Sequence, residues 1–214
     1  MEILAGLLDI VLRLDVHLGA LVRDFGPWIY AILFAVIFAE TGLVVTPFLP
    51  GDSLLFVAGA LAALGGMDVH LLVATLVVAA VLGNTVNYAI GRWLGRRFFD
   101  EGRSRWVKRE HLDRTHAFYE RFGGAAVVIS RFLPIIRTYV PFVAGLAQMG
   151  RASFTAYNVA GAVLWVASLC YAGYFFGNLP WVKQNLSLII VGIIGVSLLP
   201  LVVAWFRARR GGPA

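Results

Sequence analysis

The chain has 214 residues, of which 60% are hydrophobic and 14% charged, and its mean hydropathy is +0.81. Soluble domains carry about 25% charged residues, so this composition excludes an ordinary soluble protein and predicts an integral membrane protein. The formal net charge is +6, but the basic residues flank apolar segments. That pattern is typical of the cytoplasmic ends of membrane spans and argues against nucleic-acid binding.

The N-terminal 24 residues mix apolar positions with Asp9, Arg13 and Asp15. This segment lacks the basic start of a secretory signal peptide. Its alternation of charged and apolar residues predicts an amphipathic helix at the membrane surface, covering residues 1–24.

Residues 25–185 predict one membrane transport domain in which short apolar pieces alternate with full-length spans. The short pieces cannot cross about 30 Å of hydrocarbon at about 1.5 Å per residue, so each predicts one limb of a re-entrant hairpin. In chain order, the predicted elements are hairpin one at 27–66, a span at 69–91, a cytoplasmic amphipathic segment at 92–122, hairpin two at 123–149 and a span at 153–178. The predicted hairpin turns contain Pro47, Pro50, Gly51, Pro134 and Pro141. A C-terminal transmembrane helix at 186–206 and a basic tail at 207–214 follow.

The two halves of this domain share a tetrapeptide and an order of elements. Phe56-Val57-Ala58-Gly59 recurs as Phe142-Val143-Ala144-Gly145, and a full span follows each hairpin. The basic residues of 92–121 and of the tail place both segments, and hence the C-terminus, on the cytoplasmic side. The hairpins then open to opposite faces. This predicts an all-α polytopic membrane protein with an inverted repeat of two opposed re-entrant hairpins, which transporters use for alternating access.

Four ionisable side chains lie inside these apolar stretches: Glu40, Asp52, Arg131 and Arg137. A charged side chain at the bilayer centre costs about 3 kcal/mol, so these residues must pair or bind a ligand. Arginine stays charged in an apolar cavity and offers two parallel donors to phosphate, so Arg131 and Arg137 predict a site for an anion. An alternative stays open, in which the arginines pair permanently with the two acids and hold the hairpins together.

Glu40 and Asp52 are candidate proton-coupling residues. Burial favours the neutral form of a carboxyl and a nearby arginine favours its charged form, so a conformational change can load and release a proton. Asp52 follows Pro50-Gly51, and it suits equally well a role as the N-terminal anion of the next helix.

Other polar side chains are candidates to complete a substrate cavity. Asn84, Asn87 and Tyr88 share one helix face at spacings i, i+3 and i+4, and Thr138 adjoins Arg137. Interhelical hydrogen bonding explains the three helix residues as well, and Thr138 can equally satisfy backbone groups freed by a turn. No metal-ligand spacing and no Gly-rich phosphate loop occurs, so we expect no enzyme activity, no metal and no cofactor.

Three runs of residues that follow Glu40 in order resemble the DedA family, the bacterial branch of the superfamily that carries the VTT or SNARE-associated domain. They are PFLPGDSLL (47–55), GNTVNYAIGR (83–92) and SRFLPIIRTYVPFVAG (130–145), and the resemblance covers roughly 27–180. It implies a bacterial inner-membrane protein that depends on the proton gradient and takes part in lipid transport. Family members have been tied to the return of undecaprenyl phosphate to the cytoplasmic face, and eukaryotic relatives scramble phospholipids. The family's essential acids match Glu40 and Asp52, and its essential arginines match Arg131 and Arg137.

We therefore expect a lipid flippase of the bacterial cytoplasmic (inner) membrane that moves undecaprenyl phosphate, or a related anionic phospholipid, with coupling to the proton gradient. Its expected partners are the lipid phosphate substrate, membrane lipids and protons, without nucleic acid; homo-oligomerisation stays open. Two alternative functions also stay open, a proton-coupled exporter of small cations or drugs and an uncoupled phospholipid scramblase.

Overall fold

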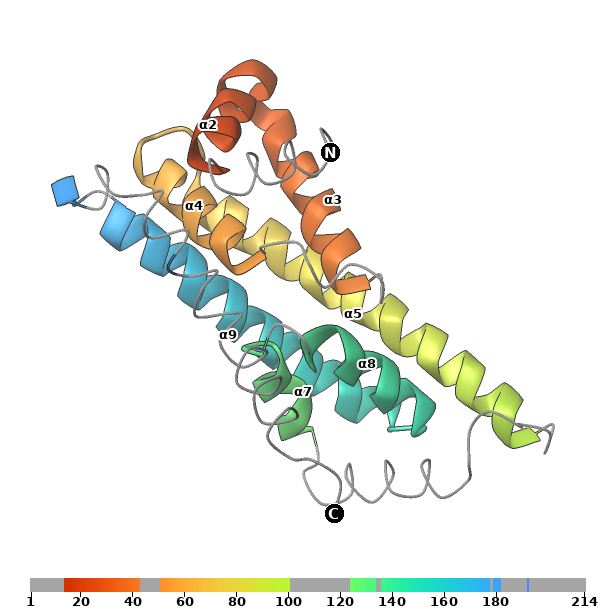
Figure 1. Cartoon of the computed structure of the whole chain (residues 1–214). Helices are drawn as coiled ribbons and strands as arrows, with labels where there is room; N and C mark the ends of the chain where they lie inside the picture. Colours follow the sequence, from red (N-terminus) through yellow and green to blue (C-terminus); the bar gives the residue numbers. More distant parts are fainter. Residues whose placement is uncertain are drawn as a thin grey trace, which may run out of the picture. The chain divides into compact units, whose positions relative to one another are not determined.

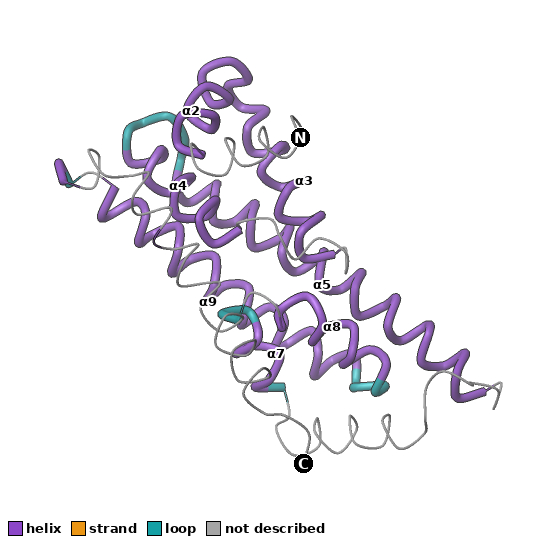
Figure 2. The backbone as a smooth tube through the Cα atoms, viewed as in Figure 1, coloured by secondary structure: helices purple, strands orange, loops and turns teal. Residues whose placement is uncertain are grey.

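The computed structural model describes residues 14–42, 51–100, 124–133, 136–177, 179–181 and 192 of the chain. Within these ranges the regular secondary structure is helical (Figure 2). Several predicted features lie outside the described residues: Pro47, Pro50, Pro134, the C-terminal helix at 186–206, the tail at 207–214 and most of the segment at 92–122.

The helices follow the chain as drawn in Figure 1. They are α2 (Leu14–Phe25), the 3-10 turn η1 (Gly26–Trp28), α3 (Ile29–Gly42), α4 (Gly51–Ala63), α5 (Val69–Asp100), α7 (Ala125–Ser130), α8 (Ile136–Leu146) and α9 (Arg151–Gly177). Three stretches of the described residues are long and apolar enough to cross a membrane: His17–Gly42, Val69–Gly95 and Arg151–Gly177. The helical class and the membrane-spanning character expected from the sequence are confirmed.

The chain forms two compact units. The first comprises Met1–Leu33, Pro50–Thr75 and Val166–Ala214, and the second comprises Phe34–Leu49 and Leu76–Trp165. Helices α3, α5 and α9 each contribute residues to both units.

The structure describes residues 14–24 of the predicted surface helix at 1–24. In the described part, α2 runs into α3 through η1, and Pro27 occupies the first turn of η1, where its missing N–H costs no hydrogen bond. Leu18 is buried, whereas Arg23 and Asp24 are exposed. The segment keeps an apolar and a polar side, and from His17 onward it is part of the apolar stretch His17–Gly42. Residues 1–13 of the predicted surface helix lie outside the described residues.

Helix α5 continues nine residues beyond the predicted end of its span at 91. Asp68 fixes its start, because its Oδ1 accepts a hydrogen bond from the Leu71 N–H at 2.8 Å. Gly91 and Gly95 do not end the helix. A Cβ on Gly91 would overlap the Phe142 carbonyl oxygen of α8, so these glycines admit a neighbouring backbone instead of breaking the helix.

Pro141 was predicted to lie in the turn of hairpin two, and the structure corrects this placement. Pro141 lies inside α8, and its ring nitrogen donates no hydrogen bond to the Arg137 carbonyl one turn earlier. The Thr138 carbonyl in the same turn accepts a hydrogen bond from Asn87 Nδ2 of α5 at 2.7 Å. Side chains of neighbouring helices can satisfy backbone groups near a proline in a membrane helix, as Asn87 does here. Arg137 and Thr138 therefore lie on helix α8 and not in a turn.

The repeated tetrapeptide packs in the same way in each unit. In the first unit, a Cβ on Gly59 of α4 would overlap the Cys170 carbonyl of α9, and a Cβ on Gly173 would overlap the Phe56 carbonyl. Only glycine permits such a reciprocal approach of two helix backbones, which is the usual contact between helices in membranes.

In the second unit, the equivalent glycine of α8 makes the equivalent contact with α5. A Cβ on Gly145 would overlap the Tyr88 carbonyl, just as one on Gly91 would overlap that of Phe142. In both units, the glycine of the tetrapeptide therefore contacts a carbonyl of a long helix, and the phenylalanine carbonyl contacts a glycine three residues further along that helix. The sequence match at 56–59 and 142–145 corresponds to a shared packing geometry.

Candidate functional site

A buried ion pair joins the first and second halves of the sequence within the second unit. Glu40 lies near the end of α3 and is fully buried, and Arg137 is the second residue of α8 and almost fully buried. Arg137 Nη2 donates a hydrogen bond to Glu40 Oε1. Removing one partner of a buried pair typically costs about 3–5 kcal/mol, so each residue requires the other in this conformation.

Arg131 is buried beside this pair, but the oxygens that it contacts are neutral. It caps the C-terminal end of α7, and its Nη2 donates a hydrogen bond of 2.6 Å to Asn158 Oδ1 on α9. Two longer contacts of 3.4 Å reach the carbonyl oxygens of Ala80 and Asn158. Its Nε has no hydrogen-bond partner among the described residues. Arg131 therefore carries a charge that no described carboxylate neutralises.

A short amide chain holds Arg131 between α5 and α9. Asn158 Oδ1 accepts from Arg131 and, at 3.2 Å, from Asn84 Nδ2. Asn158 Nδ2 donates to the Val81 carbonyl at 3.1 Å and contacts Thr85 Oγ1 at 3.4 Å. Asn158 is fully buried and Asn84 nearly so. Every polar atom of the Asn158 side chain is thus used.

The two arginines lie against one indole. The guanidinium carbons of Arg137 and Arg131 are 5.3 Å and 5.9 Å from the centre of the Trp165 ring. Trp165 is buried on α9, and a cation against an aromatic face gains about 2 kcal/mol or more when water is excluded. Trp165 thus offsets part of the cost of burying two like charges together.

The charged groups surround a small cavity inside the second unit. Its volume is about 10 Å³, and it is lined by Thr41, Asn84, Arg131, Arg137, Thr138 and Trp165. That volume accommodates about one water molecule. Among the residues that the structure describes, two arginines and one glutamate meet here and leave one net positive charge. The arrangement is therefore suited to an anion, although the described conformation is too tightly packed to hold one larger than water.

Asn87 lies behind the cavity and supports its walls. Its Nδ2 donates to the Thr138 carbonyl and makes a longer contact, 3.4 Å, with the Thr41 carbonyl. Its Oδ1 has no hydrogen-bond partner within the described ranges. Of the two interpretations offered for the amides, the geometry assigns interhelical bonding to Asn87, whereas Asn84 both bonds between helices and lines the cavity.

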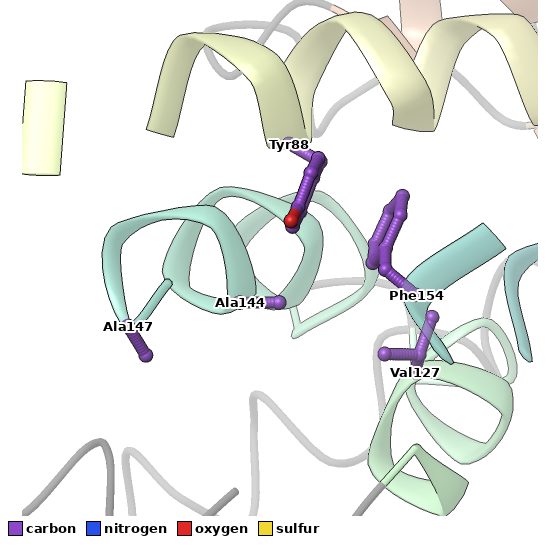
Figure 3. Close-up of a cluster of buried hydrophobic side chains, with 5 residues drawn as sticks. All are labelled: Tyr88, Val127, Ala144, Ala147 and Phe154. Atoms are coloured by element: carbon purple, nitrogen blue, oxygen red, sulfur yellow. The ribbon is translucent and has the colours of Figure 1, made fainter. Parts of the chain in front are cut away.

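Tyr88 belongs to a separate packing cluster. Its ring stacks on Phe154 with centroids 4.1 Å apart and lies with Val127, Ala144 and Ala147 in a buried apolar group (Figure 3). The Tyr88 hydroxyl donates a hydrogen bond to the Met149 carbonyl in the turn between α8 and α9. Tyr88 packs in this cluster and is not among the residues that line the cavity, so its predicted contact with substrate stays a prediction.

Arg92 strengthens the same junction. Its Nη1 donates hydrogen bonds of 2.9 Å to the Tyr88 hydroxyl and the Met149 carbonyl. Gln148, whose φ of 58° is left-handed, donates from its side chain to the Arg92 carbonyl at 3.1 Å. These contacts fix the turn that leads from α8, which carries Arg137, into α9, which carries Asn158 and Trp165.

The structure brings together most of the site residues predicted from the sequence. Arg131, Arg137, Thr138 and Asn84 line the cavity, and Glu40 pairs with Arg137. Asp52 lies in the first turn of α4 in the first unit, where an acid favours the helix N-terminus, and Gly51 begins that helix. Trp165 and Thr41 were not among the predicted site residues, because single indoles and hydroxyls are ordinary packing residues of membrane helices.

The sequence is similar to membrane proteins of one family. The family model described as the VTT domain matches residues 49–175. The protein named DedA from Escherichia coli K12 is 53% identical over 212 residues, which cover 98% of this chain and 97% of that protein. An uncharacterized membrane protein of Mycobacterium tuberculosis H37Rv is 39% identical over 194 residues, covering 88% and 85% of the two chains. The E. coli K12 inner membrane protein YqjA is 36% identical over 180 residues, covering 84% and 81%. No solved structure matches the chain.

Proposed function

Because the chain belongs to the DedA family of VTT-domain membrane proteins, we propose that it is a flippase for an anionic lipid, with undecaprenyl phosphate as the favoured substrate. In this proposal the lipid phosphate enters the cavity between Arg131 and Arg137, and the proton gradient of the bacterial inner membrane drives net movement. The C-terminus faces the cytoplasm.

One observation carries the proposal: Arg131 is buried with its charge unneutralised, beside a second arginine. Burying an unpaired ion costs several kcal/mol, and the Asn158 amide and the Trp165 ring offset only part of that cost, so the site gains free energy when an anion binds beside Arg131. A phosphate oxygen supplies the missing negative charge and accepts charge-assisted hydrogen bonds from both guanidinium groups. A cationic substrate would add repulsion to a site that already carries one net positive charge.

The Glu40–Arg137 pair supplies the coupling step of the proposal. The cavity of about 10 Å³ must open for a phosphate, and the phosphate then competes with Glu40 for Arg137. Once released from arginine inside an apolar protein, the Glu40 carboxylate favours its neutral form and takes up a proton. Phosphate binding and proton uptake thus share one partner.

A groove on the same helices suits the hydrocarbon chain of such a lipid. It has a volume of about 250 Å³ and is lined mainly by apolar residues of α7 and α8, including Ile129 and Ile136, and by Leu133 between the two helices. Ile136 directly precedes Arg137 in the sequence, so the groove adjoins the proposed head-group site. The chain can therefore stay in an apolar environment while only the head group crosses.

We further propose that the helices form an inverted repeat with two opposed re-entrant hairpins. The matching glycine contacts of α4 on α9 and of α8 on α5 support the repeat, because each hairpin helix packs on a long helix through the same tetrapeptide. The apolar helix Gly51–Ala63 is too short to span about 30 Å of hydrocarbon, which supports its assignment to a hairpin.

Accessibility labelling tests this topology. After Cys170 is replaced by alanine, single cysteines at positions 67 and 105 should react with an impermeant maleimide from opposite sides of the membrane, position 105 from the cytoplasm. The expectation follows from the basic residues of 92–121. Labelling of both positions from the same side would exclude opposed hairpins.

Equilibrium binding tests the choice of substrate. The purified full-length protein should bind a short-chain polyprenyl phosphate at least about 100-fold more tightly than the polyprenol of equal length. The polyprenol has no phosphate, so neither arginine can donate a charge-assisted hydrogen bond to it. A lipophilic cation such as tetraphenylphosphonium should bind no more tightly than the alcohol. Preference for the cation would favour the exporter alternative and contradict the proposal.

A further inference from the structure

We infer that Asn158 is a positioning residue that holds Arg131 in place without neutralising it, and that its amide thereby keeps the site selective for an anion. The inference rests on the proposed function, because it concerns the same phosphate site. Asn158 lies on α9, outside the motifs that carry the other site residues.

The hydrogen bonds of Asn158 fix Arg131 from one side. The 2.6 Å contact between Arg131 Nη2 and Asn158 Oδ1 is the shortest that Arg131 makes within the described residues. Asn158 is itself held by Asn84 and by the Val81 carbonyl, so its oxygen has a fixed position. Gly161 leaves room for the arginine, because a Cβ there would lie 3.1 Å from Arg131 Cδ.

The chemical identity of this anchor decides the charge of the site. An aspartate at position 158 would offer an oxygen at the same place and would hold Arg131 at least as firmly. It would also cancel the charge of Arg131, and with Glu40 paired to Arg137 the site would become neutral. An amide is the side chain of equal shape that fixes a guanidinium and leaves its charge available to a ligand.

The substitution Asn158→Asp therefore separates geometry from charge. The aspartate oxygen that replaces Nδ2 would face the Val81 carbonyl, and the Thr85 hydroxyl, which lies 3.4 Å from that position, can turn to donate a hydrogen bond to it. We expect Asn158→Asp to fold with a melting temperature equal to or above that of the wild type and to bind a short-chain polyprenyl phosphate at least about tenfold more weakly. Ser153→Asp is the matched control, since it adds an acid at an exposed position of the same helix and should leave binding unchanged.

A second substitution tests the role of charge directly. Glu40→Gln removes the other negative charge of the site, so the double variant Glu40→Gln/Asn158→Asp has the wild-type net charge. We expect it to recover most of the binding that Asn158→Asp loses. Asn158→Leu, which keeps the size but no hydrogen-bonding group, should weaken binding and also lower the melting temperature, because Arg131 and Asn84 lose their shared acceptor.

The outcomes distinguish this inference from the proposed function. If wild-type protein binds the phosphate and Asn158→Asp binds it equally well, Asn158 is only a structural hydrogen-bonding residue and the inference is wrong. If wild-type protein shows no preference for the phosphate over the polyprenol, the proposed function itself fails. Should Asn158→Asp fail to fold, unchanged phosphate binding by a folded Asn158→Leu variant would overturn the inference.

Discussion

Replacing Arg131 or Arg137 with alanine should weaken binding of a polyprenyl phosphate by roughly 10–100-fold and abolish its transport, with insertion into the membrane retained. Each substitution removes a permanent charge and a bidentate donor from the cavity, and a hydrogen bond to a charged group contributes about 1.5–3 kcal/mol. Binding in detergent and transport in proteoliposomes measure the two effects. Arg151→Ala is the matched control, because Arg151 is exposed at the start of α9 and should not matter.

The two arginines should differ in their effect on stability. Arg137→Ala removes the cation that pairs with the buried Glu40, so this variant should melt at a lower temperature than Arg131→Ala, which leaves neutral acceptors behind. Lysine should restore little binding at either position, because a hydrated point charge lacks the planar fork. Loss of folded protein in both variants, with normal binding by the fraction that folds, would instead support a purely structural pair.

The second large effect concerns Glu40. Glu40→Gln should bind the lipid phosphate at least as tightly as wild-type protein but should lose accumulation driven by an imposed pH gradient. The glutamine cannot take up a proton, although it can still accept a hydrogen bond from Arg137. Glu40→Asp, which keeps a carboxyl on a shorter side chain, should retain coupling at a reduced rate.

Proton linkage gives the sign of a pH effect for the same residue. If the phosphate displaces Glu40 from Arg137 and the Glu40 carboxyl is then protonated, binding of the lipid is accompanied by the uptake of one proton. Binding by wild-type protein should therefore tighten as pH falls, and Glu40→Gln should lack this contribution. Equal pH dependence of the two proteins would place the coupling group elsewhere.

The sequence allowed the charged members of the site to be predicted because charge inside apolar sequence is costly and therefore rare. Glu40, Arg131 and Arg137 were found in this way, and the structure places all three in one unit, where the two arginines line one cavity and Glu40 pairs with Arg137. The pairing could not be predicted, since hydropathy carries no information on which acid faces which arginine. The structure pairs Arg137 with Glu40 and gives Arg131 a neutral amide.

The neutral members of the site were out of reach for a different reason. An asparagine or a tryptophan in an apolar helix is an ordinary packing residue, and only its three-dimensional neighbours distinguish Asn158 and Trp165. Tyr88 shares a helix face with Asn84, but its ring packs on Phe154 and does not line the cavity, which the helical spacing alone did not reveal. Pro141 was placed in a turn because proline usually ends a helix, but it lies inside α8.

The most direct test of the central claim is transport of a polyprenyl phosphate by wild-type protein in proteoliposomes, with a pH gradient either imposed or collapsed by an ionophore. With a gradient imposed, the lipid should accumulate in one leaflet beyond an equal distribution, and reversing the gradient should reverse the preferred leaflet. Collapsing the gradient should leave equal amounts of the lipid in both leaflets. Equal distribution regardless of the gradient would show an uncoupled scramblase and would contradict the proposed role of Glu40.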